Sequence, residues 1–174
     1  MKNITVKLKT LKLNMTPLVF ARNALHFLQS AFVLHKAERL SKKNSEKSFS
    51  PVPYFLYCKG FELAFKAIYL NKNPEAVNDI ARIAKHDLKI ALLKAQETLK
   101  KKIISKEDEV IIYQLGKHYG NNAKKERGFE YFTTNMKGSM LRGFSDIPKI
   151  DDIEKISQKI IKELEMIKYN SDVI

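Results

Sequence analysis

The sequence contains a single cysteine, Cys58, which excludes an internal disulfide framework and any zinc site built from cysteines. Cys58 lies within a run of apolar residues, where we expect a buried and inert thiol rather than a reactive one. Glycine and proline are also scarce, with six glycines and five prolines in 174 residues, and they cluster between the apolar runs. This distribution favours a few long helices over many short strands.

Long uninterrupted apolar runs are absent as well. No stretch reaches the roughly 18 apolar residues that a membrane-spanning helix needs. The basic N-terminal segment has no apolar stretch of signal-peptide length, so we expect a cytoplasmic protein without a membrane partner. Phosphate-binding glycine loops and the HExxH motif are missing, and no two of the histidines stand at helical ligand spacing. We therefore expect neither a metal nor a cofactor.

Positive charge is abundant, with a formal net charge of +13 at pH 7. Such a charge attracts polyanions and speeds their association at low salt. Most of the charge is lysine, and the arginines are Arg22, Arg39, Arg82, Arg127 and Arg142. A dispersed lysine surface on solvated helices, without a specific nucleic-acid site, is the alternative interpretation.

The length and the 44% share of apolar residues predict one domain over residues 1–174 with a sizeable core. The pattern predicts an all-α, up-and-down bundle of five to six helices, over residues 17–40, 51–70, 73–85, 87–102, 105–119 and 151–169. Within residues 1–15, Ile4, Val6 and Leu8 alternate with polar neighbours, which indicates a short strand or an extended arm, with a disordered tail as the alternative. Residues 133–150 are predicted to be irregular.

Local capping signals fix several of these helix starts. Thr16 and Ser50 each precede a proline at the first helical position, and Asp87 has the position of an N-cap. Ser105 and Asp108 have the spacing of a capping box. The last helix has an apolar stripe that we expect to be buried: Ile153, Ile156, Ile160, Leu164 and Ile167.

The helix over 51–70 is apolar nearly all round, as expected at the centre of a bundle. Its only charged residues are Lys59, Glu62 and Lys66, whose spacing places them on one narrow stripe. One interpretation is a surface ion pair between Glu62 and Lys66 that contributes little. The other is a set of charges lining a groove between helices, because a charge in apolar surroundings needs a partner or a function.

His86 and Asp87 begin the next predicted helix. Helix capping alone could explain both residues. The alternative joins them to the charged stripe in one polar cluster, in which His86 has the side chain suited to proton transfer near neutral pH. The catalytic candidates are then His86, Glu62 and Lys66. The full predicted polar cluster comprises Lys59, Glu62, Lys66, His86, Asp87 and Tyr119.

The segment 124–132 is the strongest candidate for a nucleic-acid contact. Lys124, Lys125 and Arg127 can neutralise phosphates, and Tyr131 can stack on a base. Two glutamates interrupt this positive charge, and the aromatic side chains could instead anchor the segment in the core.

The segment SPVPYFLYCKGFELAFKAIYL, followed by KHDLKIALLKA, resembles a recurring pattern of HEPN-domain proteins of bacteria and archaea. In that pattern an apolar helix carries a Glu and a Lys four residues apart, here Glu62 and Lys66. A His-Asp-Leu step, here His86 to Leu88, opens the next helix. The downstream HYGNNAKKERGFEYF is similar to the tyrosine- and arginine-bearing segment of some relatives. The resemblance covers roughly residues 50–132.

This resemblance implies a four- or five-helix bundle, often a homodimer, in RNA-targeting defence or toxin–antitoxin systems with a cognate protein partner. The family's ribonuclease motif is an Arg, four to six residues, then a His near a late helix. Here Arg82 and His86, like Arg22 and His26, have three residues between them and lie in early helices. His118 has no arginine at the required spacing. The departure disfavours a standard metal-independent ribonuclease.

Three hypotheses follow. The first is an RNA-associated binding or accessory module of the HEPN-like type, without chemistry of its own. The second is a variant RNA- or nucleotide-processing enzyme built on the Glu62, Lys66 and His86 cluster. In it His86 would act as acid or base, Arg127 and Lys66 as phosphate clamps, and Tyr119 in support. The third is a structural, oligomer-forming protein whose charge is incidental.

Overall fold

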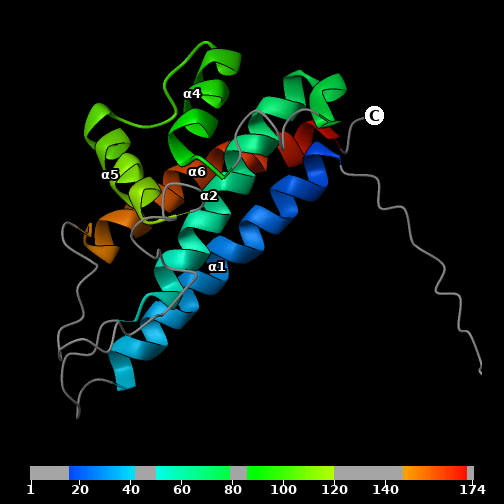
Figure 1. Ribbon diagram of the computed structural model, residues 1–174. Helices are drawn as coiled ribbons and strands as arrows, with labels where there is room; N and C mark the ends of the chain where they lie inside the picture. The colour runs from blue at the N-terminus through cyan, green and yellow to red at the C-terminus, as the bar shows by residue number, and fades with distance from the viewer. Residues whose placement is uncertain (1–15, 42–49, 79–85, 120–146, 172–174) are drawn as a thin grey trace, which may run out of the picture.

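The computed structural model of the protein describes residues 16–41, 50–78, 86–119 and 147–171, which form a bundle of helices (Figure 1). The elements are α1 (Pro17–Ser41), α2 (Val52–Lys72), the short 3-10 helix η2 (Pro74–Asn78), α4 (Leu88–Leu99), α5 (Lys106–Lys117) and α6 (Ile150–Ser171). These segments contain no β-strand. The prediction of an all-α helical bundle is confirmed.

Several helices begin where their capping residues predicted. The Thr16 hydroxyl accepts a hydrogen bond from the backbone N–H three residues on, and Asp87 does the same at the start of α4. Ser105 and Asp108 exchange both hydrogen bonds of a capping box at the start of α5. These bonds satisfy N–H groups that have no partner within the helix, so a local sequence signal is enough to set each start.

Two predicted boundaries are wrong. The N-cap of α2 is Pro51 rather than Ser50, and no side chain caps the helix, because Ser50 stands one residue too early to reach the free N–H groups. α4 ends at Leu99, three residues before the predicted end. There Lys100 adopts a left-handed conformation (φ 51°), a common way for a helix to stop.

Several sequence-based predictions lie outside the described residues. They are the strand or arm over 1–15, the later part of the third helix over 79–85, and the nucleic-acid segment over 124–132. Of the predicted irregular segment, only residues 147–150 are described, and α6 already begins at Ile150.

α2 is the central element of the bundle, in contact with α1, η2, α4, α5 and α6. Between Gly60 and Leu70 every side chain except Leu63 and Tyr69 is buried. α1 runs alongside α2 over most of its length, and α4 and α5 lie on the opposite side of α2 (Figure 1). The predicted apolar stripe of α6 is buried as well, with Ile153, Ile156, Ile160, Leu164 and Ile167 all in the core. Cys58 is buried, as expected.

None of the helices in the described part of the chain is both long enough and apolar enough to cross a membrane.

Gly60 permits the close approach of α1 and α2. A Cβ atom at this position would lie 2.5 Å from Leu28 Cδ2 and 3.3 Å from the Leu28 backbone nitrogen. Gly116 in α5 offers a matched contrast, because a Cβ there would meet only Leu88 Cβ, at an ordinary 3.6 Å.

We expect Gly60→Ala to lower the free energy of unfolding by about 1–3 kcal/mol, because the methyl group forces α1 away from α2. Gly116→Ala should raise it by about 0.5–1 kcal/mol through better helix propensity. Urea denaturation of both variants checks the pair. Equal effects of the two substitutions would contradict the close α1–α2 approach.

Candidate functional site

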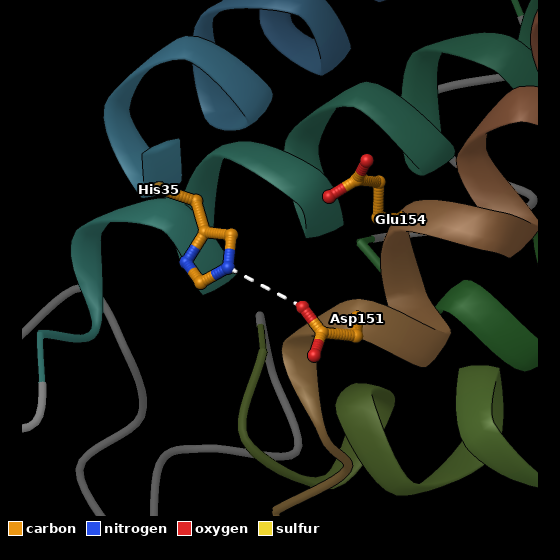
Figure 2. Close-up of side chains that lie close together, drawn as sticks. All are labelled: His35, Asp151 and Glu154. Atoms are coloured by element: carbon orange, nitrogen blue, oxygen red, sulfur yellow. Dashed lines mark ion pairs between the residues drawn. The ribbon is translucent and has the colours of Figure 1, made fainter. Parts of the chain in front are cut away.

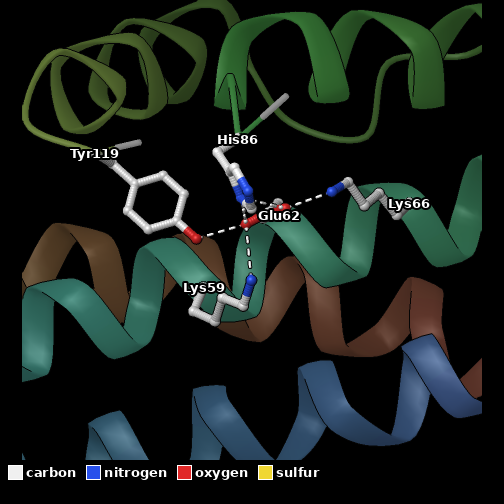
Figure 3. A network of polar contacts seen from close by, with 5 residues as sticks. All are labelled: Lys59, Glu62, Lys66, His86 and Tyr119. Atoms are coloured by element: carbon white, nitrogen blue, oxygen red, sulfur yellow. Dashed lines mark hydrogen bonds and ion pairs between the residues drawn. The ribbon is translucent and has the colours of Figure 1, made fainter. Parts of the chain in front are cut away.

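Glu62 lies in the middle of α2, and its side chain is 1% exposed. Lys66, one turn further along, is 7% exposed. The interpretation of these two residues as a surface ion pair is therefore wrong. Glu62 and Lys66 do not face water because α4 and the end of α5 cover them, whereas Lys59 is 27% exposed (Figure 3).

The Glu62 carboxylate is the common acceptor of a polar network (Figure 3). The Lys66 ammonium donates to Oε1, and the Tyr119 hydroxyl donates to Oε2. Lys59 Nζ donates to Oε2 over 3.2 Å. His86 Nδ1 lies 3.0 Å from Oε1 and 3.1 Å from Oε2. An ionised carboxylate accepts about four hydrogen bonds, so this network satisfies both oxygens fully.

The electrostatics of the network keep Glu62 ionised. Burial by itself would raise the pKa of Glu62, but the hydrogen bonds from Lys66 and Tyr119 and the charges of Lys66 and Lys59 outweigh it and lower the pKa to about 2. One carboxylate and two ammonium groups leave a net charge of +1. Protonation of His86 would raise this charge to +2.

The Glu62 contact also determines the tautomer of His86. A carboxylate that is ionised at neutral pH can only accept hydrogen bonds, so Nδ1 of the neutral ring must carry the hydrogen. Nε2 is then the nitrogen available to a ligand, as an acceptor in the neutral ring or a donor in the imidazolium. The His86 side chain is 54% exposed. A buried carboxylate thus orients an accessible imidazole, an arrangement that enzymes and metal sites use to position histidine.

The backbone of His86 is in the left-handed region, with φ 65°. For residues other than glycine this region costs about 1–2 kcal/mol, and such residues persist where their contacts compensate. The contact with Glu62 is one such contact. Strained residues concentrate at functional sites, so the conformation is independent support for a role of His86 beyond helix capping.

Tyr119 directly follows the C-cap residue of α5, and its side chain is 1% exposed. Its ring packs against Phe55, with the ring centroids 6.1 Å apart. Tyr119 therefore contacts the network from the core side, where it supports Glu62 and has little access to a ligand.

The structure brings together five of the six residues of the predicted polar cluster, Lys59, Glu62, Lys66, His86 and Tyr119, from α2, the start of α4 and the end of α5. The sixth, Asp87, accepts a hydrogen bond from the Ile90 N–H as the N-cap of α4. The buried Lys66 ammonium is a partner of Glu62 rather than a clamp for a ligand. The groups that reach the surface are His86 and, at 27% exposure, Lys59. The predicted nucleic-acid residues Lys124, Lys125, Arg127 and Tyr131 lie outside the described residues.

Comparisons of the chain with models of protein families, with curated proteins and with solved structures find no match.

Proposed function

We propose that the protein is a HEPN-like, RNA-associated binding module, and that one RNA contact lies where Lys59 and His86 reach the surface above Glu62. The observation that carries the proposal is the charge of the network. The network carries a net positive charge, and Glu62 contacts both of the side chains that reach the surface. A phosphodiester would meet one ammonium and one imidazole in fixed positions.

Lys59 has the donors that this proposal requires. Its ammonium has three N–H groups and uses one of them on Glu62. The others can contact a phosphate without breaking the network. His86 adds a second donor through Nε2 when its ring is protonated. The net charge of +13 supplies the long-range attraction that brings RNA to the surface.

The remaining parts of the proposal rest on the family resemblance. They are a homodimer and a cognate protein partner in a defence or toxin–antitoxin system. Light scattering on the purified protein measures the oligomeric state directly.

The RNA contact is tested by fluorescence anisotropy with a labelled oligouridylate at a series of salt concentrations. We expect affinity to fall steeply between about 50 and 200 mM salt, because binding releases counterions from the RNA. Lys59→Gln should weaken binding and reduce the slope of log K against log salt by about 0.7, the value for one phosphate contact on a single strand.

Lys155→Gln is the matched control, since it also removes one positive charge. Lys155 lies on α6, is 72% exposed and pairs only with Asp152 among the described residues. We expect little change for this variant. Equal losses in the two variants would mean that RNA contacts a dispersed basic surface, and no binding at low salt would exclude RNA as the partner.

A second candidate function, RNA cleavage, is favoured by the contact between Glu62 and His86 Nδ1. With the hydrogen on Nδ1, the neutral His86 ring can accept the proton of a ribose 2′-hydroxyl at Nε2 while that oxygen attacks the adjacent phosphorus and the bond to the 5′-oxygen breaks. Water protonates the departing 5′-oxygen, so the products are a 2′,3′-cyclic phosphate and a 5′-hydroxyl. The same labelled RNA, run on a denaturing gel, tests this candidate. Intact RNA, or cleavage that persists in His86→Ala, would leave only the binding module.

A further inference from the structure

A second cluster of polar side chains lies where α1 and α6 meet, at His35, Asp151 and Glu154 (Figure 2). His35 lies in the last two turns of α1, and the two carboxylates stand three residues apart near the start of α6. One ligand atom from each side chain lies within 4.8 Å of the other two. The three side chains point toward one common space (Figure 2).

The distance between His35 and Asp151 bears on whether the two side chains can bind one metal ion. His35 Nε2 lies 3.6 Å from Asp151 Oδ1, which is longer than a hydrogen bond. Two ligands bound to one tetrahedral metal ion at about 2.0–2.1 Å each would lie about 3.4 Å apart. The pair is thus too far apart for a hydrogen bond and at nearly the right separation to share an ion.

Two buried polar atoms at this place have no hydrogen-bond partner among the described residues, His35 Nε2 and the Tyr57 hydroxyl oxygen. Tyr57 is fully buried. Its burial first, and then the charges of Glu154 and Asp151, raise the pKa of the phenol, which places the hydroxyl in the field of the two carboxylates. An unsatisfied buried polar group costs about 1–3 kcal/mol, and an ion or water that binds there is a common explanation.

We propose that His35, Asp151 and Glu154 form a binding site for a divalent first-row transition metal, with Zn²⁺ as the best match. One imidazole and two carboxylates are a donor set that Zn²⁺ accepts in proteins. Three protein ligands leave a fourth position open to water, and Asp151 is 61% exposed, so this position is accessible. The neutral Tyr57 hydroxyl lies in the field of the two carboxylate ligands.

Arg39 is the group that competes with a metal for this site. Its guanidinium donates to Asp151 Oδ1 over 3.3 Å. Arg39 and Asp151 are 66% and 61% exposed, and an ion pair this exposed contributes about 0–1 kcal/mol. A metal ion that gains three ligands can therefore displace the Arg39 guanidinium from Asp151. The site is independent of the RNA contact, because it shares no residue with the Glu62 network.

Isothermal titration calorimetry of the untagged, full-length protein with ZnCl₂ tests the site. We expect one Zn²⁺ per chain with micromolar or tighter affinity. His35→Ala and Glu154→Gln should each weaken binding by about 10-fold or more, as the loss of one ligand implies. Co²⁺ should produce visible absorption bands in the wild-type protein and lose them in both variants.

His26→Ala is the matched control, because His26 lies on the same helix with an exposed side chain and should leave binding unchanged. Far-ultraviolet circular dichroism confirms that each variant is folded, and the partly exposed Glu154 provides a second test if His35→Ala unfolds. The proposal is overturned if micromolar Zn²⁺ produces no binding. It is also overturned if both ligand variants bind as the wild type does, since His35 and Asp151 would then form only an ion pair.

Discussion

Replacing Glu62 by alanine is expected to lower the free energy of unfolding by about 3–5 kcal/mol, because it leaves the buried Lys66 ammonium without its counter-charge. The Tyr119 hydroxyl, itself buried, loses its acceptor at the same time. A typical domain has a total stability of about 5–15 kcal/mol, so the variant should be close to unfolding at room temperature. Urea denaturation monitored by circular dichroism measures the effect.

Glu97→Ala is the control for this substitution. Glu97 is also a helical glutamate paired with a lysine, Lys94, but its side chain is 67% exposed. Its loss should change stability by no more than about 0.5 kcal/mol. If Glu62→Ala lowered the free energy of unfolding by no more than Glu97→Ala does, the Glu62 carboxylate could not be a buried acceptor of the network.

Acidification is expected to remove the contribution of Glu62 in a defined pH window. The pKa of Glu62 is about 2 in the folded protein, against an ordinary value of 4.5. The unfolded chain therefore binds a proton at Glu62 at higher pH than the folded protein does. The stabilisation is complete above about pH 4.5 and is lost as the pH falls toward 2, a change of about 3 kcal/mol.

Other carboxylates titrate in the same range, so the comparison must isolate Glu62. Urea midpoints of the wild type and of Glu62→Gln, measured from pH 6 down to pH 2, provide this comparison. The difference between the two stability curves should shrink steadily as the pH falls through the window. Two parallel curves would show that the carboxylate has an ordinary pKa.

The sequence predicts much of this fold because the decisive signals are local. Thr16, Asp87 and the pair Ser105 and Asp108 cap their helices through residues at most three positions away. Ser50 does not cap α2, because an N-cap residue must stand directly before the first helical residue and Pro51 has that position. A serine before a proline does not fix that register by itself.

The polar cluster could be predicted only in part. Helical spacing places Lys59, Glu62 and Lys66 on one face, but periodicity does not reveal what covers that face. The side chains that contact this face include His86 and Tyr119, which are 24 and 57 residues from Glu62 in the sequence. Only the packing of α4 and α5 on α2 turns an ordinary helical ion pair into a buried network.

The proposed metal ligands could not be predicted from the sequence for the same reason. The sequence predicted no metal site, because no two histidines stand at helical ligand spacing and no HExxH motif is present. Asp151 and Glu154, three residues apart at a helix start, are a common pattern that helix stability explains by itself. His35 joins them only through the packing of α1 against α6.

We propose that the Glu62 network holds His86 at the surface as an RNA contact. The most direct test is a nitrogen–proton correlation spectrum of the histidine rings, recorded before and after addition of oligouridylate. We predict that the neutral His86 ring carries its hydrogen on Nδ1, and that its Nε2 signal shifts on binding while the exposed His26 signals stay in place. RNA binding that leaves the His86 signals unmoved would contradict the claim.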